Sequence, residues 1–278
     1  MRALLAIAVL AAAPVPAQNV AQAPARPPTL APARVVHEWP TEEARQGAAA
    51  DARYVYAVNN NQIGKYDKAT GRRVARFEGE RRLFPHMNSC LVDGAELICA
   101  GSNYPAVPQA SVIEIFDTAT LHHRRSIALA PFPGSLTWIE RRGTTWFAMF
   151  ANYPADRGGE GGRDYRWTTL VELDASFRAL RSWHLPESIL SRLAPMSVSG
   201  GSWGADGLLY ITGHDAPELY VLRLPTAGTV LEHVATVPLP TEGQAFAWDR
   251  SRRRTIVTIT RKDRRIVASV VPDVAVER

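Results

Sequence analysis

Two histidines of this chain stand where they could move a proton. His86 precedes a predicted strand, and His214 is followed directly by Asp215. An imidazole titrates near neutral pH, and a neighbouring carboxylate can orient it, so these residues are candidates for acid–base catalysis. Arg163 and Arg166 lie in a glycine-rich segment and are candidates for holding an anionic substrate. These five residues form the predicted catalytic set.

The same part of the sequence leaves metal binding open. Two histidines are too few for a zinc site, and the chain has no HExxH motif. Asp156, Glu160 and Asp164 could supply calcium ligands, but their spacing is not that of an EF-hand. The sequence therefore names no metal and no other cofactor.

Other familiar catalytic motifs are missing. The chain has no GxSxG, SxxK or P-loop sequence, which leaves no recognisable serine nucleophile or nucleotide-binding loop. A pair of carboxylates of the glycosidase type stays open, because only their separation decides whether two such groups work together. The candidates for such a pair are Glu43, Glu242, Asp164 and Asp215.

A second set of candidates consists of amides and hydroxyls. Asn103 and Asn152 each begin an Asn-Tyr-Pro tripeptide that follows an apolar stretch. Such groups can hydrogen-bond a polar ligand such as a sugar, or they can cap their own turns and satisfy buried water. The predicted ligand-binding residues are Gln46, Asn88, Ser89, Asn103, Asn152, Ser202 and Gln244.

Five windows of six residues, each ending in an acid, organise the chain. The intervals between successive acids are 42, 47, 66 and 43 residues, which suit a four-stranded propeller blade of about 40–45 residues with one insertion. Short β-branched or aromatic segments bounded by turn residues follow each window, as expected for further strands. The windows are 46–51, 88–93, 135–140, 201–206 and 244–249.

The two ends of the repeat complement each other. The fifth unit lacks a fourth strand, whereas 33–40 reads as an extra strand ahead of the first unit. We expect this strand to complete the last blade and close the ring, because closure removes the exposed edges of an open array. The sequence thus predicts an all-β, five-bladed β-propeller over 34–273, with a C-terminal tail at 274–278. A β-sandwich is the alternative, but it does not explain five matched units.

The repeat also predicts where the candidates lie. The loops that lead into the inner strands, and those that join second and third strands, share one face of a propeller, which we call the leading face. Polar segments gather in these loops, whereas the opposite, trailing face has short turns such as 67–71 and 92–96. We therefore expect the site at the tunnel mouth on the leading face.

The N-terminal segment indicates export. Residues 1–17 combine an early positive charge, an apolar run too short to span a bilayer and small residues near the end, as in a cleaved signal peptide. The proline- and alanine-rich residues 18–33 predict a flexible linker. We expect a periplasmic or secreted monomer with no membrane span after cleavage.

The charge and the cysteines add two expectations. The net charge of +5 is carried by arginine, and the arginine-rich segment 250–266 could contact an anionic polymer. A solvated hairpin whose charges discourage edge pairing is favoured, so nucleic acid is not an expected partner.

Cys90 and Cys99 face each other if Gly94 and Ala95 form a hairpin turn. A cross-strand disulfide is predicted, with a reduced, buried pair as the alternative.

Several stretches resemble known propellers. The segments 88–105, 200–225 and 243–249 are similar to those of exported bacterial propellers, some of which are labelled cycloisomerase. Gln46-Gly47 with Tyr56, followed by the turn 67–71, resembles one blade of the propeller-type glutaminyl cyclotransferases. The resemblance implies a propeller fold and carries over no catalytic residue.

Two functions of different class follow. The first is a binding module that recognises a small polar or carbohydrate-like ligand at the tunnel mouth through the amide and hydroxyl set. The second is an enzyme, a lyase, cycloisomerase or hydrolase, in which His86 or His214 moves a proton and Arg163 or Arg166 holds the substrate. The sequence leaves both open.

Overall fold

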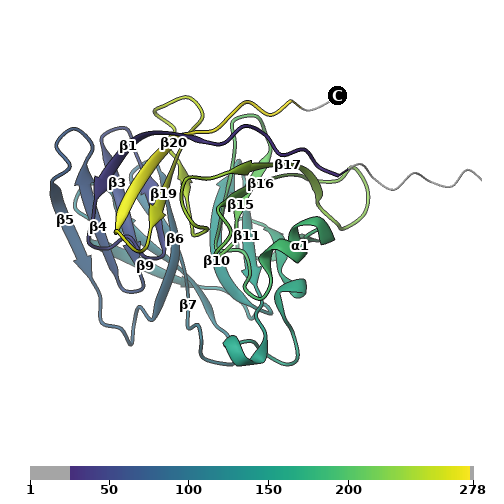
Figure 1. The fold of residues 1–278 in the computed structure, drawn as a ribbon. Helices are drawn as coiled ribbons and strands as arrows, with labels where there is room; N and C mark the ends of the chain where they lie inside the picture. Colours follow the sequence, from purple (N-terminus) through teal and green to yellow (C-terminus); the bar gives the residue numbers. More distant parts are fainter. Residues whose placement is uncertain (1–25, 276–278) are drawn as a thin grey trace, which may run out of the picture.

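The chain folds into a ring of five sheets. The computed structural model describes residues 26–275, which form twenty strands in five four-stranded antiparallel sheets. The five-bladed β-propeller predicted from the repeat is therefore confirmed (Figure 1). The predicted signal peptide, 1–17, lies outside the described residues.

Each blade runs outward from an inner strand. Blade 1 contains β2 (Gly47–Ala50), β3 (Tyr54–Asn59), β4 (Gln62–Asp67) and β5 (Arg73–Glu78). Blade 2 contains β6 (His86–Asp93), β7 (Glu96–Ser102), β8 (Ser111–Asp117) and β9 (His123–Ala128). Blade 3 contains β10 (Ser135–Arg142), β11 (Thr145–Ala151), β12 (Thr169–Leu173) and β13 (Ala179–His184). Blade 4 contains β14 (Gly200–Trp203), β15 (Leu209–Thr212), β16 (Glu218–Arg223) and β17 (Glu232–Pro238). Blade 5 contains β18 (Ala247–Trp248), β19 (Thr255–Thr260), β20 (Arg265–Val270) and β1 (Arg34–Pro40).

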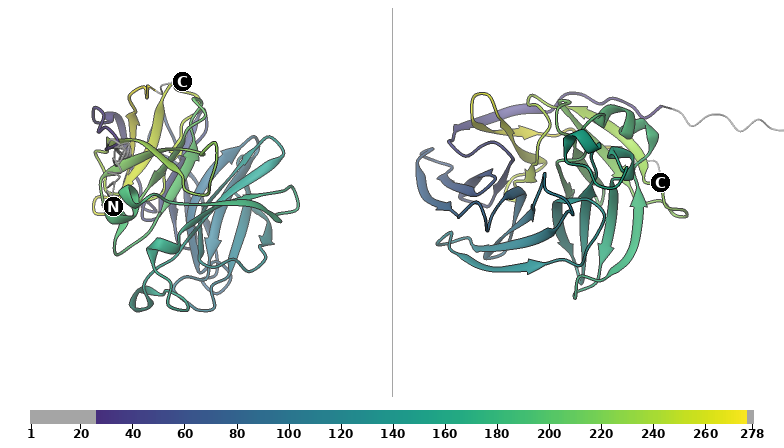
Figure 2. Two further views of the ribbon diagram at one scale, coloured as in Figure 1. Left: turned by 90° about the vertical axis from the view of Figure 1, so that its right-hand side faces the viewer. Right: turned by 90° about the horizontal axis from the view of Figure 1, so that it is seen from below.

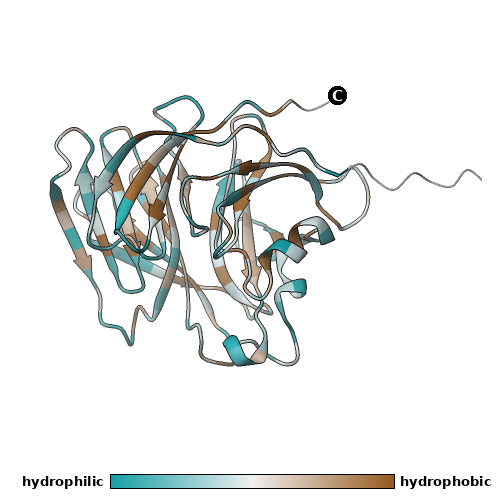
Figure 3. Ribbon diagram, in the orientation of Figure 1, coloured by the Kyte–Doolittle hydropathy of each residue, from teal (hydrophilic) through white to brown (hydrophobic). Residues whose placement is uncertain are grey.

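The strands differ in burial according to their place in the blade. The second and third strands are buried almost throughout, as in β3 and β19, because both of their faces pack against neighbouring blades. Hydrophilic and hydrophobic residues alternate along the outer strand β5, most of which is exposed (Figure 3). On β5 only the partly buried Ala75 and Phe77 pack against the core of blade 1.

Two inner strands, β2 and β14, begin with glycine because they approach the start of blade 5 closely. A Cβ added at Gly47 would lie 2.7 Å from Ala245 Cβ, and one at Gly200 would lie 2.5 Å from Ala245 Cα. Gly47 also forms an isolated parallel bridge with Ala245. Blades 1, 4 and 5 therefore touch at the leading end of the tunnel.

The first and last strands share blade 5. Strand β1 pairs antiparallel with β20 from Arg34↔Val270 to Pro40↔Arg265, and the two lie side by side in Figures 1 and 2. Trp39 is buried, and its indole Nε1 donates to the Lys68 carbonyl oxygen of blade 1 at 3.0 Å. Strand β1 thus joins blade 5 to blade 1.

Part of the segment predicted as a linker is held against the ring. The amide nitrogens of Leu30 and Ala33 donate to the carbonyl oxygens of Thr236 and Pro238, and the Thr236 amide donates to Pro28. Residues 28–33 therefore run along β17 with regular backbone hydrogen bonds.

The long interval in the repeat holds two insertions. One contains the 3-10 helices η1 (Ala155–Arg157) and η2 (Tyr165–Trp167), in the segment where the sequence predicted an insertion. The other contains helix α1 (Glu187–Leu193), which the sequence did not predict. Ile189, Leu190 and Leu193 bury the inner side of α1 in the core of blades 3 and 4.

No helix within residues 26–275 is long and apolar enough to cross a bilayer.

The cysteine prediction is confirmed. Cys90 and Cys99 are register partners on β6 and β7 and form a disulfide. The bond lies inside one blade and fastens its inner strand to the next.

Replacing Trp39 tests how much the N-terminal strand contributes to the ring. Because Trp39 is 3% exposed, we expect Trp39→Ala to lower the free energy of unfolding by about 3–5 kcal/mol. Val35→Ala, at an exposed position of the same strand, should change it by about 0.5 kcal/mol or less. Urea denaturation measures both, and equal effects of the two variants would contradict the role of Trp39.

Candidate functional site

A cavity lies at the trailing end of the central tunnel. It has a volume of about 600 Å³, and all five blades contribute to it at or just after the ends of their inner strands. The lining residues are 50–52, 91–94, 140–142, 202–204, 247–248 and 250–251. The sequence had placed the site at the opposite, leading mouth, where the inner strands touch.

The acids that mark the repeat lie at the trailing ends of the inner strands, and three of them, Asp51, Asp93 and Glu140, line this cavity. Four of the five form ion pairs across blade boundaries. The pairs are Asp93 with Arg141 at 2.8 Å, Glu140 with Arg250 at 2.6 Å, Asp206 with Arg254 at 2.8 Å and Asp249 with Lys68 at 2.6 Å. Asp51 instead accepts from the Tyr56 hydroxyl of its own blade at 2.6 Å. The repeated acid is therefore first of all a structural residue.

Glu140, the fifth of these acids, is buried at the base of the cavity. One carboxylate oxygen, Oε2, accepts from the Ser202 hydroxyl and the Trp203 amide, each at 2.8 Å. The other, Oε1, accepts from Arg250 Nη2 at 2.6 Å. Burial raises the pKa of this carboxyl, although Arg250 and the hydrogen bonds act in the opposite direction. Glu140 links blades 3, 4 and 5.

The guanidinium of Arg250 is hydrogen-bonded through one of its three nitrogens, Nη2. Its Nη2 donates both to Glu140 and to the Trp203 carbonyl oxygen, the latter at 3.1 Å. Its side chain is 52% exposed, and among residues 26–275 its Nε and Nη1 make no hydrogen bond. The protein thus orients a guanidinium whose free donors are available to a ligand.

Arg142 places a second cation in the lining of this cavity. Its guanidinium carbon lies 4.2 Å from the centre of the Trp203 ring, a cation–π distance. In the described part of the chain no carboxylate pairs with Arg142. The cavity is therefore lined by two guanidiniums that keep free donors for an anionic group.

The predicted catalytic residues lie elsewhere, on the leading face and on blade 3. His214 and Asp215 are in contact, with Nδ1 and Oδ1 2.6 Å apart. Arg261 Nη1 lies 3.2 Å from His214 Nε2. Because arginine only donates, Nε2 must accept, so Nδ1 carries the proton and donates to Asp215. The lone pair that a general base would need is therefore already engaged.

The other predicted catalytic residues are separate from this pair. His86 is partly buried beside Tyr104, with ring centres 5.2 Å apart, and burial lowers its pKa. Arg166 pairs with Asp164 of its own turn at 2.6 Å. Arg163 lines a groove of about 390 Å³ on the outer part of blade 3. Across residues 26–275, no hydrogen bond or ion pair joins these groups to His214.

The amides predicted to bind ligand are used within the protein. Each donates to an acceptor of the chain. The bonds are Gln46 to Asn60 Oδ1, Asn88 to Leu136 O, Asn103 to Pro108 O, Asn152 to Pro133 O and Trp167 O, and Gln244 to His214 O. Ser89 is buried, whereas Ser202 lies at the trailing end, on Glu140. Of this set only Ser202 lines the tunnel cavity.

The repeated Asn-Tyr-Pro tripeptides have a structural role in this arrangement. Asn103 closes its own loop, since its Oδ1 also accepts from the Ala110 amide at 2.8 Å. The two tyrosines that follow, Tyr104 and Tyr153, pack on each other between blades 2 and 3, with ring centres 4.9 Å apart. This matches the turn-capping alternative considered for the sequence.

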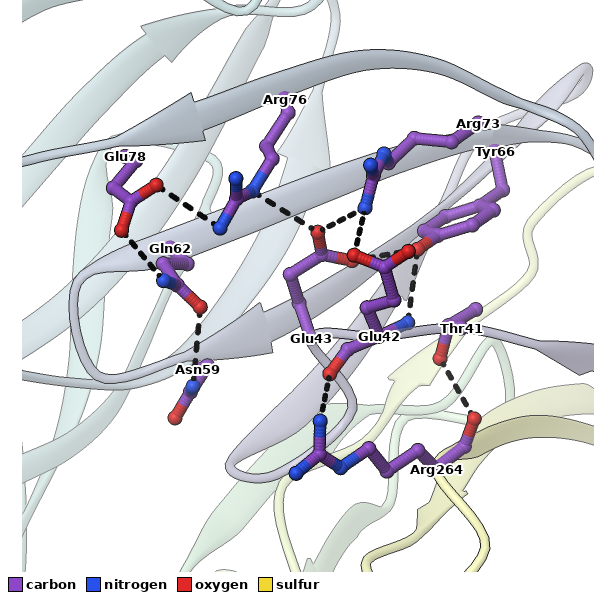
Figure 4. Close-up of polar contacts among 10 residues, drawn as sticks. All are labelled: Thr41, Glu42, Glu43, Asn59, Gln62, Tyr66, Arg73, Arg76, Glu78 and Arg264. Carbon is purple, nitrogen blue, oxygen red and sulfur yellow. Dashed lines mark hydrogen bonds and ion pairs between the residues drawn. The ribbon is translucent and has the colours of Figure 1, made fainter.

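The carboxylates considered as a glycosidase pair are engaged within the protein, and two of them, Asp215 and Glu242, lie against the same cation, Arg261. Glu43 is buried and accepts from the Tyr66 hydroxyl at 2.6 Å and from Arg73 at 3.0 Å (Figure 4). Its carboxylate fills the space above Gly64, where an added Cβ would lie 2.1 Å from Oε2. Glu242 instead lies 3.7 Å from Arg261. Glu43 thus anchors the loop between β1 and β2.

Metal binding stays open in chemical terms. Within the described residues, no three His, Cys, Asp or Glu side chains are grouped as metal ligands would be. The acids around the tunnel cavity are each turned toward a cation or a tyrosine of the protein.

Arg142, Arg250 and Glu140 were not predicted as site residues. Glu140 had been read only as a marker of the repeat, and Arg142 and Arg250 follow two of those markers within two residues. The signal that could have found them is this recurrence of arginine just after the repeated acid, where the trailing turns face the tunnel.

The comparisons with known proteins show similarity in fold only. The sequence matches no family model and no curated protein. A luciferin-regenerating enzyme is similar over 86% of this chain and 97% of its own, with a TM-score of 0.49 and 10% identity. The propeller domain of Cps50 (Swd1) from Myceliophteria thermophila is similar over 81% of this chain and 83% of its own, with a TM-score of 0.40 and 12% identity. A Bacteroides caccae protein of unknown function is similar over 76% of this chain and 69% of its own, with a TM-score of 0.40 and 14% identity.

Glu140 leads to a pH-dependent prediction. Because its pKa is raised above the ordinary value of 4.5, the folded protein binds this proton more tightly than the unfolded chain does. The contribution of Glu140 to the free energy of unfolding therefore falls as the pH rises from about 4.5 through the raised pKa. Glu140→Gln removes this titration. The stability of the variant relative to wild type should increase from about pH 4 to about pH 8.

Urea denaturation of both proteins at the two pH values gives the comparison. Asp263→Asn, at an exposed position of the leading face, reports the effect of removing a carboxylate that is not buried. A stability difference for Glu140→Gln that stays constant or decreases with pH would show that burial does not raise the pKa.

Proposed function

We propose that this propeller binds a small ligand with a polar, sugar-like body and an anionic group, in the cavity at the trailing end of its tunnel. The observation that carries the proposal is that Arg142 and Arg250 both line this cavity and that both guanidiniums keep donors with no partner among residues 26–275. Charge-assisted hydrogen bonds from arginine to a carboxylate or phosphate are among the strongest polar contacts in proteins.

The remaining lining supports a polar ligand body. Ser251, Asp51 and Asp93 line the same cavity as the two arginines. Their oxygens are engaged within the protein by Asp249, Tyr56 and Arg141, so a ligand hydroxyl can reach only their remaining lone pairs. The volume of about 600 Å³ lies within the range of small-molecule sites.

The proposal includes export. The signal-like residues 1–17 indicate passage out of the cytoplasm. The Cys90–Cys99 disulfide supports the same location, because disulfides persist in oxidising compartments. The ligand is therefore one that occurs in the periplasm or outside the cell.

Titration calorimetry with glucuronate and galacturonate tests the site. Arg142→Ala and Arg250→Ala should each weaken binding about tenfold or more, because each removes a hydrogen bond to a charged group. Arg223→Ala removes a half-exposed arginine of blade 4 that pairs with Glu232 and should leave the affinity unchanged. Neutral glucose and galactose should bind more weakly than the acids. Wild-type affinity in both cavity variants would contradict the proposal.

The alternative of an enzyme that uses the predicted histidines stays a prediction. If His86 or His214 moves a proton, turnover of a lyase, cycloisomerase or hydrolase substrate should depend on pH and be lost in His86→Ala and His214→Ala. Ligand binding in the tunnel cavity that survives both changes supports the binding module.

A further inference from the structure

Two more cavities adjoin the tunnel cavity on the trailing face. One, of about 430 Å³, shares Trp248, Arg250 and Ser251 with it. The other, of about 530 Å³, shares Ala52 with it. The two side cavities also share Arg252 with each other. The three hollows therefore surround one turn, the connection between β18 and β19.

Arg252 stands at the junction of the side cavities. Its backbone amide donates to the Asp249 carbonyl oxygen at 3.0 Å, which holds the turn. Its side chain is exposed and, within residues 26–275, has neither a hydrogen bond nor an ion pair. Together with Arg142 and Arg250 it makes three guanidiniums with free donors on the trailing face, so positive charge extends beyond the tunnel cavity.

The acids around the hollows are engaged by other side chains of the protein. Asp206 and Asp273 of the first side cavity pair with Arg254, and Asp67 of the second pairs with Arg53. The charges left without a partner among residues 26–275 are therefore those of arginines. A chain of acidic sugars can place its carboxylates on these arginines and donate its many hydroxyls to the remaining lone pairs of the acids.

Trp248 separates two of the hollows. It lines both the tunnel cavity and the first side cavity, and its buried ring is fixed edge-to-face against Tyr210, with ring centres 5.0 Å apart. The two hollows are therefore held side by side by a rigid residue, as neighbouring units of one chain require.

We propose that the trailing face binds a linear oligosaccharide of acidic sugars, with one unit in the tunnel cavity and further units in the side cavities past Arg252. This inference rests on the proposed function, since it assigns the ligand class of the same site. Each hollow has a volume within the range of a small-molecule site. Affinity should therefore grow with the number of linked units.

Calorimetry with galacturonate, digalacturonate and tetragalacturonate tests the inference. The tetramer should bind about tenfold or more tightly than the monomer, since its additional units add contacts without a second loss of translational freedom. Arg252→Ala should remove most of this gain and leave monomer binding unchanged. Arg142→Ala should weaken the monomer and the tetramer alike. Arg223→Ala, on blade 4, is the matched control and should change neither.

The outcomes separate the two proposals. Monomer binding that depends on Arg142, without any gain for the tetramer, overturns the inference and leaves the proposed function standing. No binding of either uronate or of the tetramer overturns the proposed function and the inference with it. A tetramer whose carboxylates are methyl-esterified should lose the gain. A single-stranded DNA of equal charge that binds more tightly, and through Arg252, overturns the choice of sugar.

Discussion

The ring depends on contacts between the acid at the end of each inner strand and a cation or tyrosine. The pair of Lys68 and Asp249 is the most buried of these, with side chains 8% and 2% exposed. Buried ions are costly unless their hydrogen bonds are satisfied, and Lys68 also donates to the Asp51 carbonyl oxygen. Where such a pair lies between two blades, the length of its side chains sets the distance between them. Without these side chains the two backbones could approach more closely.

This constraint makes the two tunnel mouths different. At the leading end Gly47 and Gly200 let blades 1 and 4 approach Ala245 of blade 5 closely. At the trailing end carboxylates, arginines and indoles replace these small residues, so the blades diverge around a polar hollow. The first residues of an inner strand such as β14 thus pack closely against a neighbouring blade, whereas its last residues line the cavity.

The fold could be predicted from the sequence far better than the site. Acids at regular intervals and alternating short strands are local features, and they were sufficient for five blades and for the Cys90–Cys99 pair. Helix α1 was missed because a seven-residue helix between two strands carries too short a pattern. The cavity at the trailing end was not predicted, because it depends on contacts between blades, such as Glu140 with Arg250, whose residues are remote in sequence.

The sharing of blade 5 between β1 and β20 has a consequence for how the protein is made. Strand β1 finds its partner only when residues 265–270 are present, so the ring closes late. Contacts of such sequence separation slow folding. A molecule truncated before residue 265 would leave β1 as an unpaired edge, which can add to the sheet of a second copy.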